Sequence, residues 1–195
     1  DASKRGIIQI AMLMEIDGKI EDELLVDVQP FPQDLIEFSE RIEFYDTTKD
    51  LVKDFASTYE KIPIIPSGIL LKNLIAFEFP NEAYQKVIKF LDGYISKFDK
   101  TDKVYLGGYN VQFDRGFISQ FFKKWGDNYL GSYLNWKCLD PLYLLWQMDA
   151  DGEIALENYK LKTAAKYFGF ELEAHNALSD IKATYKLYKK LREKC

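Results

Sequence analysis

Hydrophobic and polar positions follow two different patterns along the chain, and the first pattern predicts a β-hairpin. Residues 7–16 form an apolar run with β-branched members, and residues 19–29 form a second strand-like run. Asp17 and Gly18 separate the two runs, and an Asp-Gly pair suits the tight turns that join antiparallel strands. Prolines follow the second run and are expected to end it.

Helical spacing of apolar residues dominates the remainder of the chain. It predicts helices over residues 81–98, 113–125, 160–168 and 176–193, and a further helix that opens at Asp140-Pro141. Asn81 is expected to cap the first of these helices, and Asp140 to cap the helix that it precedes. The last helix is expected to bury one stripe of side chains: Leu178, Ile181, Tyr185, Tyr188 and Leu191.

The remaining segments complete a mixed architecture. Short apolar runs at 103–109 and 133–138 predict strands, while residues 33–80 show helical patterns only around 47–60 and 69–77, interrupted by prolines. The order is therefore hairpin, helices, strand, helix, strand, helices. This order predicts a single α/β domain with a mixed sheet.

Composition narrows the class of protein further. The chain has 195 residues, 47% of them hydrophobic, and no run approaches the roughly 20 apolar residues that span a membrane. Only two cysteines occur, so we expect a cytoplasmic protein without a disulfide framework. A net charge of −5 counts against a protein that coats nucleic acid, but not against an enzyme that acts on strand ends.

Basic residues gather near the carboxyl end of the chain. They are Lys182, Lys186, Lys189, Lys190 and Arg192. One interpretation is a solvated helix face with cations at its negative dipole end, and the other is a contact with a substrate backbone.

Two segments carry the candidate chemistry. His175, the single histidine, precedes the last predicted helix by a short distance, and Asp180 lies on that helix. A histidine on a loop beside a helical carboxylate could act as a base toward water at a metal site. Asp114 follows a buried strand and a glycine-rich turn, at the kind of sheet edge where ligands collect.

Together these segments resemble the DnaQ-like exonucleases, also called the DEDDh group. The second family motif is N-x-x-F-D, here Asn110 to Asp114, and the third is H-x-A-x-x-D, here His175 to Asp180. The tyrosine subgroup would have tyrosine four residues before the last aspartate, where this chain has Asn176. The histidine subgroup therefore fits better than the tyrosine subgroup.

The resemblance implies a ribonuclease H-like fold and a 3′→5′ exonuclease that releases nucleoside monophosphates. Two Mg²⁺ or Mn²⁺ ions about 4 Å apart would hold the scissile phosphate, bound in part by Asp114 and Asp180. His175 would take the proton from the attacking water. Asn110 and Phe113 would form part of the substrate site, with Phe113 expected to pack beneath it. The implied partners are single-stranded DNA or RNA 3′ ends and a polymerase or other replication or repair protein, with no membrane.

The first motif of the same family is D-x-E, and it does not occur at the position where the resemblance requires it. Asp1 corresponds to an aspartate in the turn after that motif, about seven positions downstream of the catalytic aspartate. We therefore expect the domain to be incomplete at its amino end. The absent strand would be the central one, between the hairpin and the 103–109 strand.

Other interpretations stay open at this level. The fold could belong to a catalytically inactive module that binds nucleic acid or a protein partner, or to a ribonuclease H-type endonuclease, which would not use the histidine motif. The acidic run 21–23 is expected to be a solvent-facing edge of the hairpin. Tyr143 and Trp146 recur at helical spacing and are expected to be mostly core.

Overall fold

A computed structural model describes residues 7, 9–29, 77–172 and 176–193 of the chain. The short helices expected around 47–60 and 69–77 lie outside these residues, except for Phe77. So does His175. Within the described part, no helix is both long and apolar enough to cross a membrane.

The hairpin forms as predicted. Strands β1 (Gln9–Ile16) and β2 (Lys19–Asp27) pair in antiparallel fashion. The turn residues Asp17 and Gly18 both have positive φ angles, of 50° and 82°, which is the conformation that two-residue hairpin turns require. The backbone N–H of Gly18 donates to the carboxylate of Glu15, so the turn is also held by a side chain.

Two further strands pair in parallel. They are β3 (Val104–Gly107) and β4 (Leu134–Leu139), joined through a helix as parallel strands require. Among the described residues, β1 pairs only with β2 and β3 only with β4. The mixed sheet expected from the sequence is thus present as two separate strand pairs in this part of the chain.

Apart from α4, the helices occupy nearly the predicted ranges. They are α4 (Pro80–Asp92), α5 (Val111–Lys124), α6 (Pro141–Ala150), α7 (Leu161–Tyr167) and α8 (Ala177–Arg192), with a 3₁₀ turn η2 (Leu130–Ser132). Asp140 caps α6 through a hydrogen bond from the backbone N–H of Leu142, as expected.

The prediction for α4 was wrong at both ends. The helix begins at Pro80, with Phe79 in the capping position, so Asn81 lies inside the helix and does not cap it. It ends at Asp92, although Ile95 is buried. The apolar spacing beyond Asp92 therefore comes from a loop that packs against the core, and spacing alone cannot distinguish that from a longer helix.

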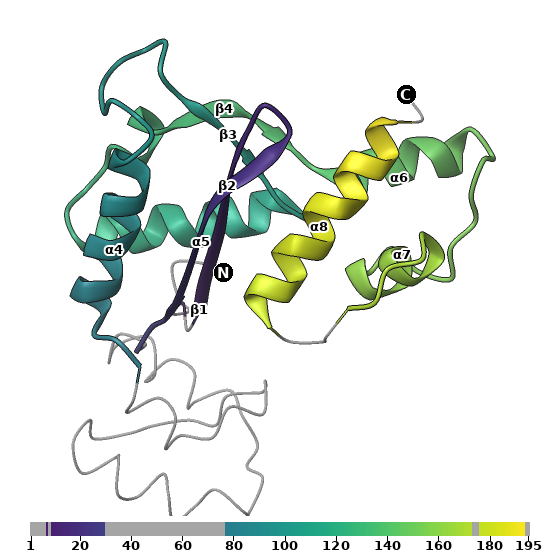
Figure 1. Cartoon of the computed structure of the whole chain (residues 1–195), viewed down its shortest axis with the longest axis horizontal. Coiled ribbons are helices and arrows are strands. Elements are labelled where there is room, and N and C mark those ends of the chain that lie inside the picture. The colour runs from purple at the N-terminus through teal and green to yellow at the C-terminus, as the bar shows by residue number, and fades with distance from the viewer. Residues whose placement is uncertain (1–6, 8, 30–76, 173–175, 194–195) are drawn as a thin grey trace, which may run out of the picture.

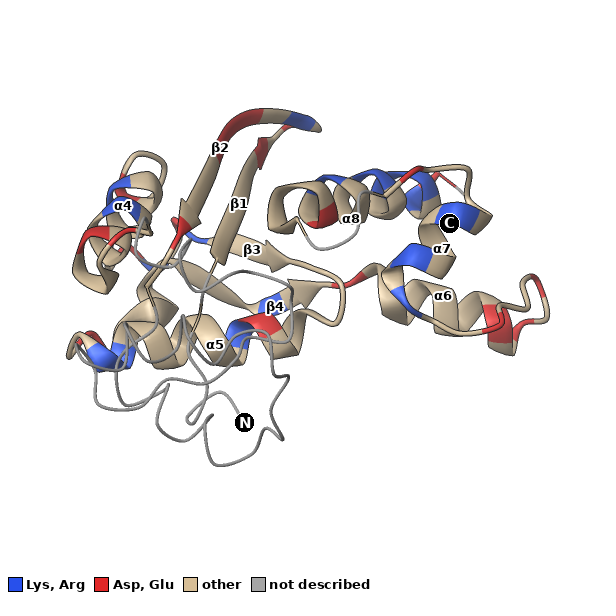
Figure 2. Ribbon diagram, turned by 90° about the horizontal axis from the view of Figure 1, so that it is seen from below, with Lys and Arg blue, Asp and Glu red and all other residues tan. Residues whose placement is uncertain are grey.

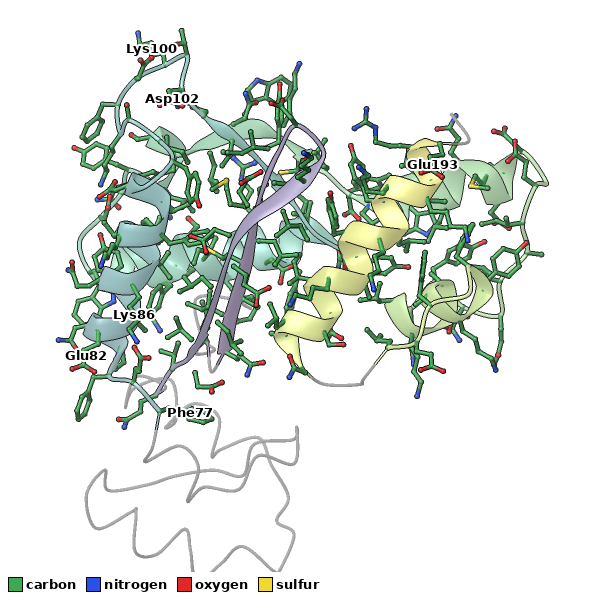
Figure 3. The ribbon with its side chains drawn as sticks, in the orientation of Figure 1. Phe77, Glu82, Lys86, Lys100, Asp102 and Glu193 are labelled. Carbon is green, nitrogen blue, oxygen red and sulfur yellow. The ribbon has the colours of Figure 1, made fainter. Side chains whose placement is uncertain are left out.

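The connection after α4 is stabilised by its own carboxylates. Asp102 accepts a hydrogen bond from the backbone N–H of Ser96 at 2.7 Å, and Asp99 accepts two from Thr101. Lys100 and Asp102 lie at the outer tip of this connection (Figure 3). These local bonds turn the chain from α4 toward β3.

Two apolar cores hold the elements together, on either side of the molecule in Figure 1. The first joins the hairpin with α4 and α5 and includes Val26, Val87 and Phe122. The second joins α6, α7 and α8 and includes Leu145 and Leu187. Helix α8 belongs to the second core and also contacts β1, so it lies between the hairpin and helices α6 and α7.

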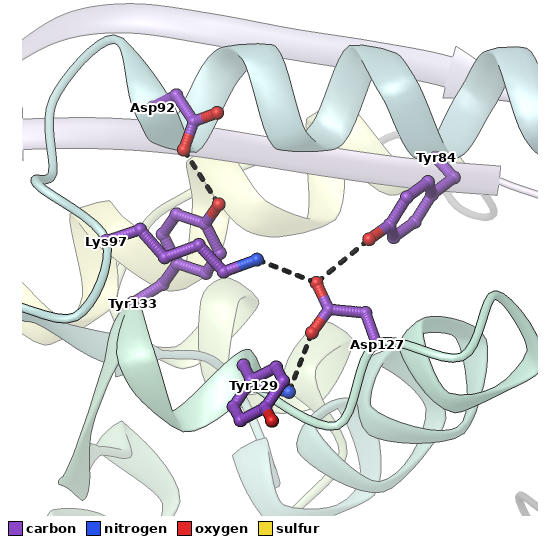
Figure 4. Close-up of polar contacts among 6 residues, drawn as sticks. All are labelled: Tyr84, Asp92, Lys97, Asp127, Tyr129 and Tyr133. Carbon is purple, nitrogen blue, oxygen red and sulfur yellow. Dashed lines mark hydrogen bonds and ion pairs between the residues drawn. The ribbon is translucent and has the colours of Figure 1, made fainter.

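A polar cluster ties together the loops beside the first core (Figure 4). The Asp127 carboxylate accepts hydrogen bonds from the Tyr84 hydroxyl and the Lys97 ammonium, both at 2.9 Å, and from the backbone N–H of Tyr129 at 2.7 Å. The Tyr133 hydroxyl donates to Asp92 at 2.7 Å. Helix α4 and its following loop are thereby joined to the chain that connects α5 with β4.

Two expectations about side-chain environment need correction. Tyr143 and Trp146 are not core residues: they are 52% and 47% exposed and stack edge to face on the outside of α6. Helix α6 buries Leu142, Leu145 and Met148 instead. On α8 the buried row is Ala183, Thr184, Leu187 and Leu191, so only Leu191 of the predicted stripe is fully buried.

The basic residues of α8 serve the fold itself. Lys189 and Tyr185 both donate to the carbonyl of Gly18 in the hairpin turn, at 3.1 and 2.9 Å. Lys182 forms an ion pair with Glu23 at 2.7 Å, and Lys190 donates to the carbonyl of Phe168. Figure 2 shows basic positions along α8 and an acidic stretch within β2. These three lysines bind other parts of the fold, which neither interpretation from the sequence included. A contact of this helix with substrate stays a prediction.

Candidate functional site

Asp114 lies in the first turn of α5, where the chain leaves the parallel strand pair. Strand β3 ends at Gly107, and Gly108 continues its pairing by donating its N–H to the carbonyl of Leu139. Asn110 then adopts a left-handed conformation, with φ 58° and ψ 48°, and the helix begins at Val111. The predicted placement of Asp114 at the carboxyl end of a strand is therefore confirmed.

The surroundings of Asp114 favour its neutral form. The residue is solvent-accessible, but its Oδ2 atom lies against Gly108, 3.4 Å from where a Cβ atom would stand. Partial desolvation raises the pKa of Asp114 to about 6, opposed by its own backbone N–H and reinforced by the negative charge of Asp140. A carboxylate held in this way gains from a nearby cation, because the cation would compensate its charge.

Asn110 and Phe113 flank this position in different ways. Asn110 is exposed and contributes mainly the backbone turn that starts the helix. Phe113 does not pack beneath the site as expected. Its side chain is 57% exposed and stacks against Phe117, with 4.7 Å between the ring centroids. Residue 113 faces outward because the buried face of α5 is formed by Ile118, Phe121 and Phe122.

Asp180 lies in the first turn of α8, and that turn is anchored to the hairpin. The Asn176 side chain caps α8 by accepting hydrogen bonds from the N–H groups of Leu178 and Ser179. The Gln9 side chain accepts from the N–H of Ala177 at 2.9 Å and donates to Asp27 at 2.6 Å. The Oδ1 atom of Asp180 is buried. A strand of the hairpin thus fixes the start of the helix that bears Asp180.

Carboxylate oxygens are the ligands that Mg²⁺ and Mn²⁺ prefer, so Asp114 and Asp180 fit such ions chemically. Among the described residues, no three His, Cys, Asp or Glu side chains gather into a group that could hold a metal ion. The described part of the chain therefore shows no assembled metal site. Convergence of Asp114 with Asp180 and His175 stays a prediction.

The sequence alone gave Asp140 the role of a helix cap, and the structure adds a second role. Asp140 is 6% exposed, and its carboxylate accepts hydrogen bonds from the backbone N–H groups of Asn110 at 3.1 Å and Val111 at 2.9 Å. These residues lie about 30 positions earlier in the chain, so no local pattern could reveal the contact. The parallel pairing of β3 with β4 brings the two segments together.

Comparison with known proteins adds one finding. The sequence model of the RNase T family, described as an exonuclease, matches residues 82–188, which is more than half of the chain. No curated protein matches the chain. The matched range contains the candidate residues Asn110, Phe113, Asp114, His175 and Asp180.

Proposed function

Because the chain belongs to the RNase T family of exonucleases, we propose that it is a metal-dependent enzyme of the DEDDh group. In this proposal it hydrolyses nucleic acid from the 3′ end to nucleoside monophosphates. The observation that carries the proposal is that the family match spans both motifs, N-x-x-F-D at 110–114 and H-x-A-x-x-D at 175–180, in the family's order.

The role proposed for each residue follows from the chemistry of its side chain. Asp114 and Asp180 would hold divalent cations, and two Mg²⁺ or Mn²⁺ ions would supply charge stabilisation for the attacking and leaving oxygens. His175 accepts the proton of the attacking water, because imidazole titrates close to neutral pH. The raised pKa of Asp114, about 6, means that without a cation the carboxyl is only half ionised at that pH, and a bound cation would favour the ionised form.

Phe113 and Asn110 are proposed to contact the substrate. The exposed ring of Phe113 lies one residue before Asp114 and offers an apolar face to a nucleobase at the strand terminus. Stacking on an aromatic ring tolerates any base and both sugars, so this contact does not select DNA over RNA. Asn110 lies in the turn directly before the first residue of α5.

Two divalent cations held close together need more negative charge than two aspartates provide. Further oxygen ligands are therefore proposed to complete the metal site.

The direct test is degradation of a 5′-labelled single strand in the presence of Mg²⁺. The protein is produced both as the 195-residue chain and with any coding sequence found upstream. We expect stepwise shortening from the 3′ end, abolished by EDTA and reduced at least about 100-fold by His175→Ala, in line with the loss of a general base. Tyr143→Ala, on the outer side of α6, is the matched control and should retain activity.

Two results would reject the proposal. One is the absence of degradation by the folded protein, tested both as the 195-residue chain and with any upstream coding sequence. The other is degradation that His175→Ala leaves unchanged. Binding of the labelled strand without any cleavage would instead support the alternative, a catalytically inactive nuclease fold that binds nucleic acid.

A further inference from the structure

We propose that Asp140 is a positioning residue of the candidate site. Its single buried carboxylate holds the amino-terminal ends of α5 and α6 together, and in this way it fixes the segment 108–114 that presents Asp114. The expected effect on catalysis rests on the proposed function, whereas the hydrogen bonds of Asp140 do not depend on it.

Both oxygens of the Asp140 carboxylate are used. Oδ1 accepts from the N–H of Leu142 at 3.0 Å, in α6, and from the N–H of Asn110 at 3.1 Å. Oδ2 accepts from the N–H of Val111 at 2.9 Å, in the first turn of α5. The first N–H groups of a helix have no partner within the helix, and here one carboxylate serves two helices at once.

The backbone around Asn110 explains why an anion is needed. The backbone of Asn110 is in the left-handed conformation and that of Val111 is helical. These two conformations in succession direct neighbouring N–H groups toward one anionic group. A residue other than glycine adopts the left-handed conformation at a cost in free energy. The hydrogen bonds to Asp140 compensate that cost and keep the turn in place.

The arrangement extends the parallel pairing of β3 and β4 beyond its last residue pair. Gly107 pairs with Leu139, Gly108 donates to the carbonyl of Leu139, and the N–H groups of Asn110 and Val111 reach Asp140. On the other side, the Tyr109 hydroxyl donates to the carbonyl of Tyr159 at 2.6 Å. The segment before Asp114 is therefore held from two directions.

The same contact determines what binds at the start of α5. Helix amino termini attract phosphate groups, but here the Asp140 carboxylate already occupies the N–H groups of Asn110 and Val111. We therefore expect substrate phosphate to be held through cations at Asp114 and not by the amino terminus of α5. Asp140 is also close enough to Asp114 for its charge to raise the pKa of that residue.

Three substitutions separate the two tasks of Asp140. Asp140→Ser keeps a good capping residue for α6 but is too short to reach the N–H groups of Asn110 and Val111. Asp140→Ala removes both contacts. Asp140→Asn keeps the volume but turns one oxygen into an N–H₂ group, which cannot accept a bond from an N–H. Asp140→Asn replaces Asp140→Ser and Asp140→Ala in the measurements if those two variants do not fold.

The first measurement is hydrogen exchange of the intact chain, without metal or substrate, followed by mass spectrometry. In Asp140→Ser we expect residues 108–115 to exchange at least about tenfold faster while residues 142–150 keep their protection. In Asp140→Ala both segments should exchange faster. Asp127→Ser is the matched control, because it removes another mostly buried carboxylate that accepts three hydrogen bonds, beyond the opposite end of α5.

The second measurement is exonuclease kinetics on the labelled single strand. Asp140→Ser should lower kcat by about 10- to 100-fold and leave KM within about twofold, since a displaced ligand affects the chemical step more than binding. Asp127→Ser should leave both values unchanged. Wild-type protection of 108–115 in Asp140→Ser would overturn the proposal, and so would faster exchange there with an unchanged kcat. If the wild type shows no activity, the proposed function fails and hydrogen exchange alone decides the structural contact.

Discussion

At the scale of single residues, the protonation of the Asp114 side chain depends strongly on its environment. Its pKa in the folded chain, about 6, lies above the ordinary value of 3.8. Folding therefore favours the protonated form. The stability that this form contributes is present below about pH 4 and is lost as the pH rises to about 6, so at pH 8 the ionised carboxylate destabilises the fold.

Asp114→Asn is accordingly expected to stabilise the protein when divalent cations are absent. At pH 8 in EDTA we expect the Tm to rise by about 2 °C, a modest gain because the residue is solvent-accessible. The difference should disappear below about pH 4, where the wild-type carboxyl is neutral. Thermal unfolding followed by circular dichroism checks this. Asp99→Asn is the control, with no gain expected, because hydrogen bonds from Thr101 lower the pKa of Asp99. A lower Tm for Asp114→Asn at pH 8 would contradict the prediction.

At the scale of secondary-structure elements, the contact between α8 and the hairpin turn links the two cores. The Tyr185 hydroxyl and the Lys189 ammonium converge on one carbonyl, that of Gly18, while the Lys182–Glu23 ion pair lies further along the strand. Each contact is exposed, so each contributes modestly. Together they set the position of α8, and with it that of Asp180.

Tyr185→Phe should therefore destabilise the fold by about 1 kcal/mol, the usual contribution of one hydrogen bond. Lys182→Ala should cost about 0.5 kcal/mol or less, because its ion pair with Glu23 is solvent-exposed. Urea unfolding measures both values. Lys186→Ala, on an exposed position of the same helix, is the reference and should change stability by less than either. Equal effects of Tyr185→Phe and Lys186→Ala would show that the contact with Gly18 does not support the fold.

At the scale of the whole molecule, the cluster around Asp127 joins α4 to the connection between α5 and β4. The Asp127 side chain is only 9% exposed. Its burial alone would raise the pKa, but hydrogen bonds from Lys97, Tyr129 and Tyr84 lower it below 3.8 overall. The stability contributed by the ionised form is thus present above about pH 4 and is lost as the pH falls through the lowered pKa.

Lys97→Met should remove the cation from this cluster and cost about 2 kcal/mol at pH 7, because a mostly buried carboxylate loses its charged partner. The difference between Lys97→Met and the wild type should shrink toward pH 3, where Asp127 begins to be protonated in both proteins. Urea unfolding at the two pH values provides the comparison. A difference that stays the same at both pH values would indicate that Lys97 acts through its aliphatic chain or its contact with the Tyr133 ring.

The sequence by itself determined the parts of this protein that depend on neighbouring residues. The turn at Asp17 and Gly18, the start of α6 at Asp140 and the position of Asp114 after β3 all follow from local backbone preference and capping. The order of the two motifs also lies in the sequence, and the family match covers the range that contains both.

Only the tertiary structure decided which side chains are buried and which distant segments meet. Tyr143 and Trp146 have helical spacing, yet both side chains are exposed on α6. The bonds from Asn110 and Val111 to Asp140 arise because parallel strands bring residues some 30 positions apart to the same edge. Periodicity shows that a helix has faces, but burial and long-range hydrogen bonds depend on what packs against each face.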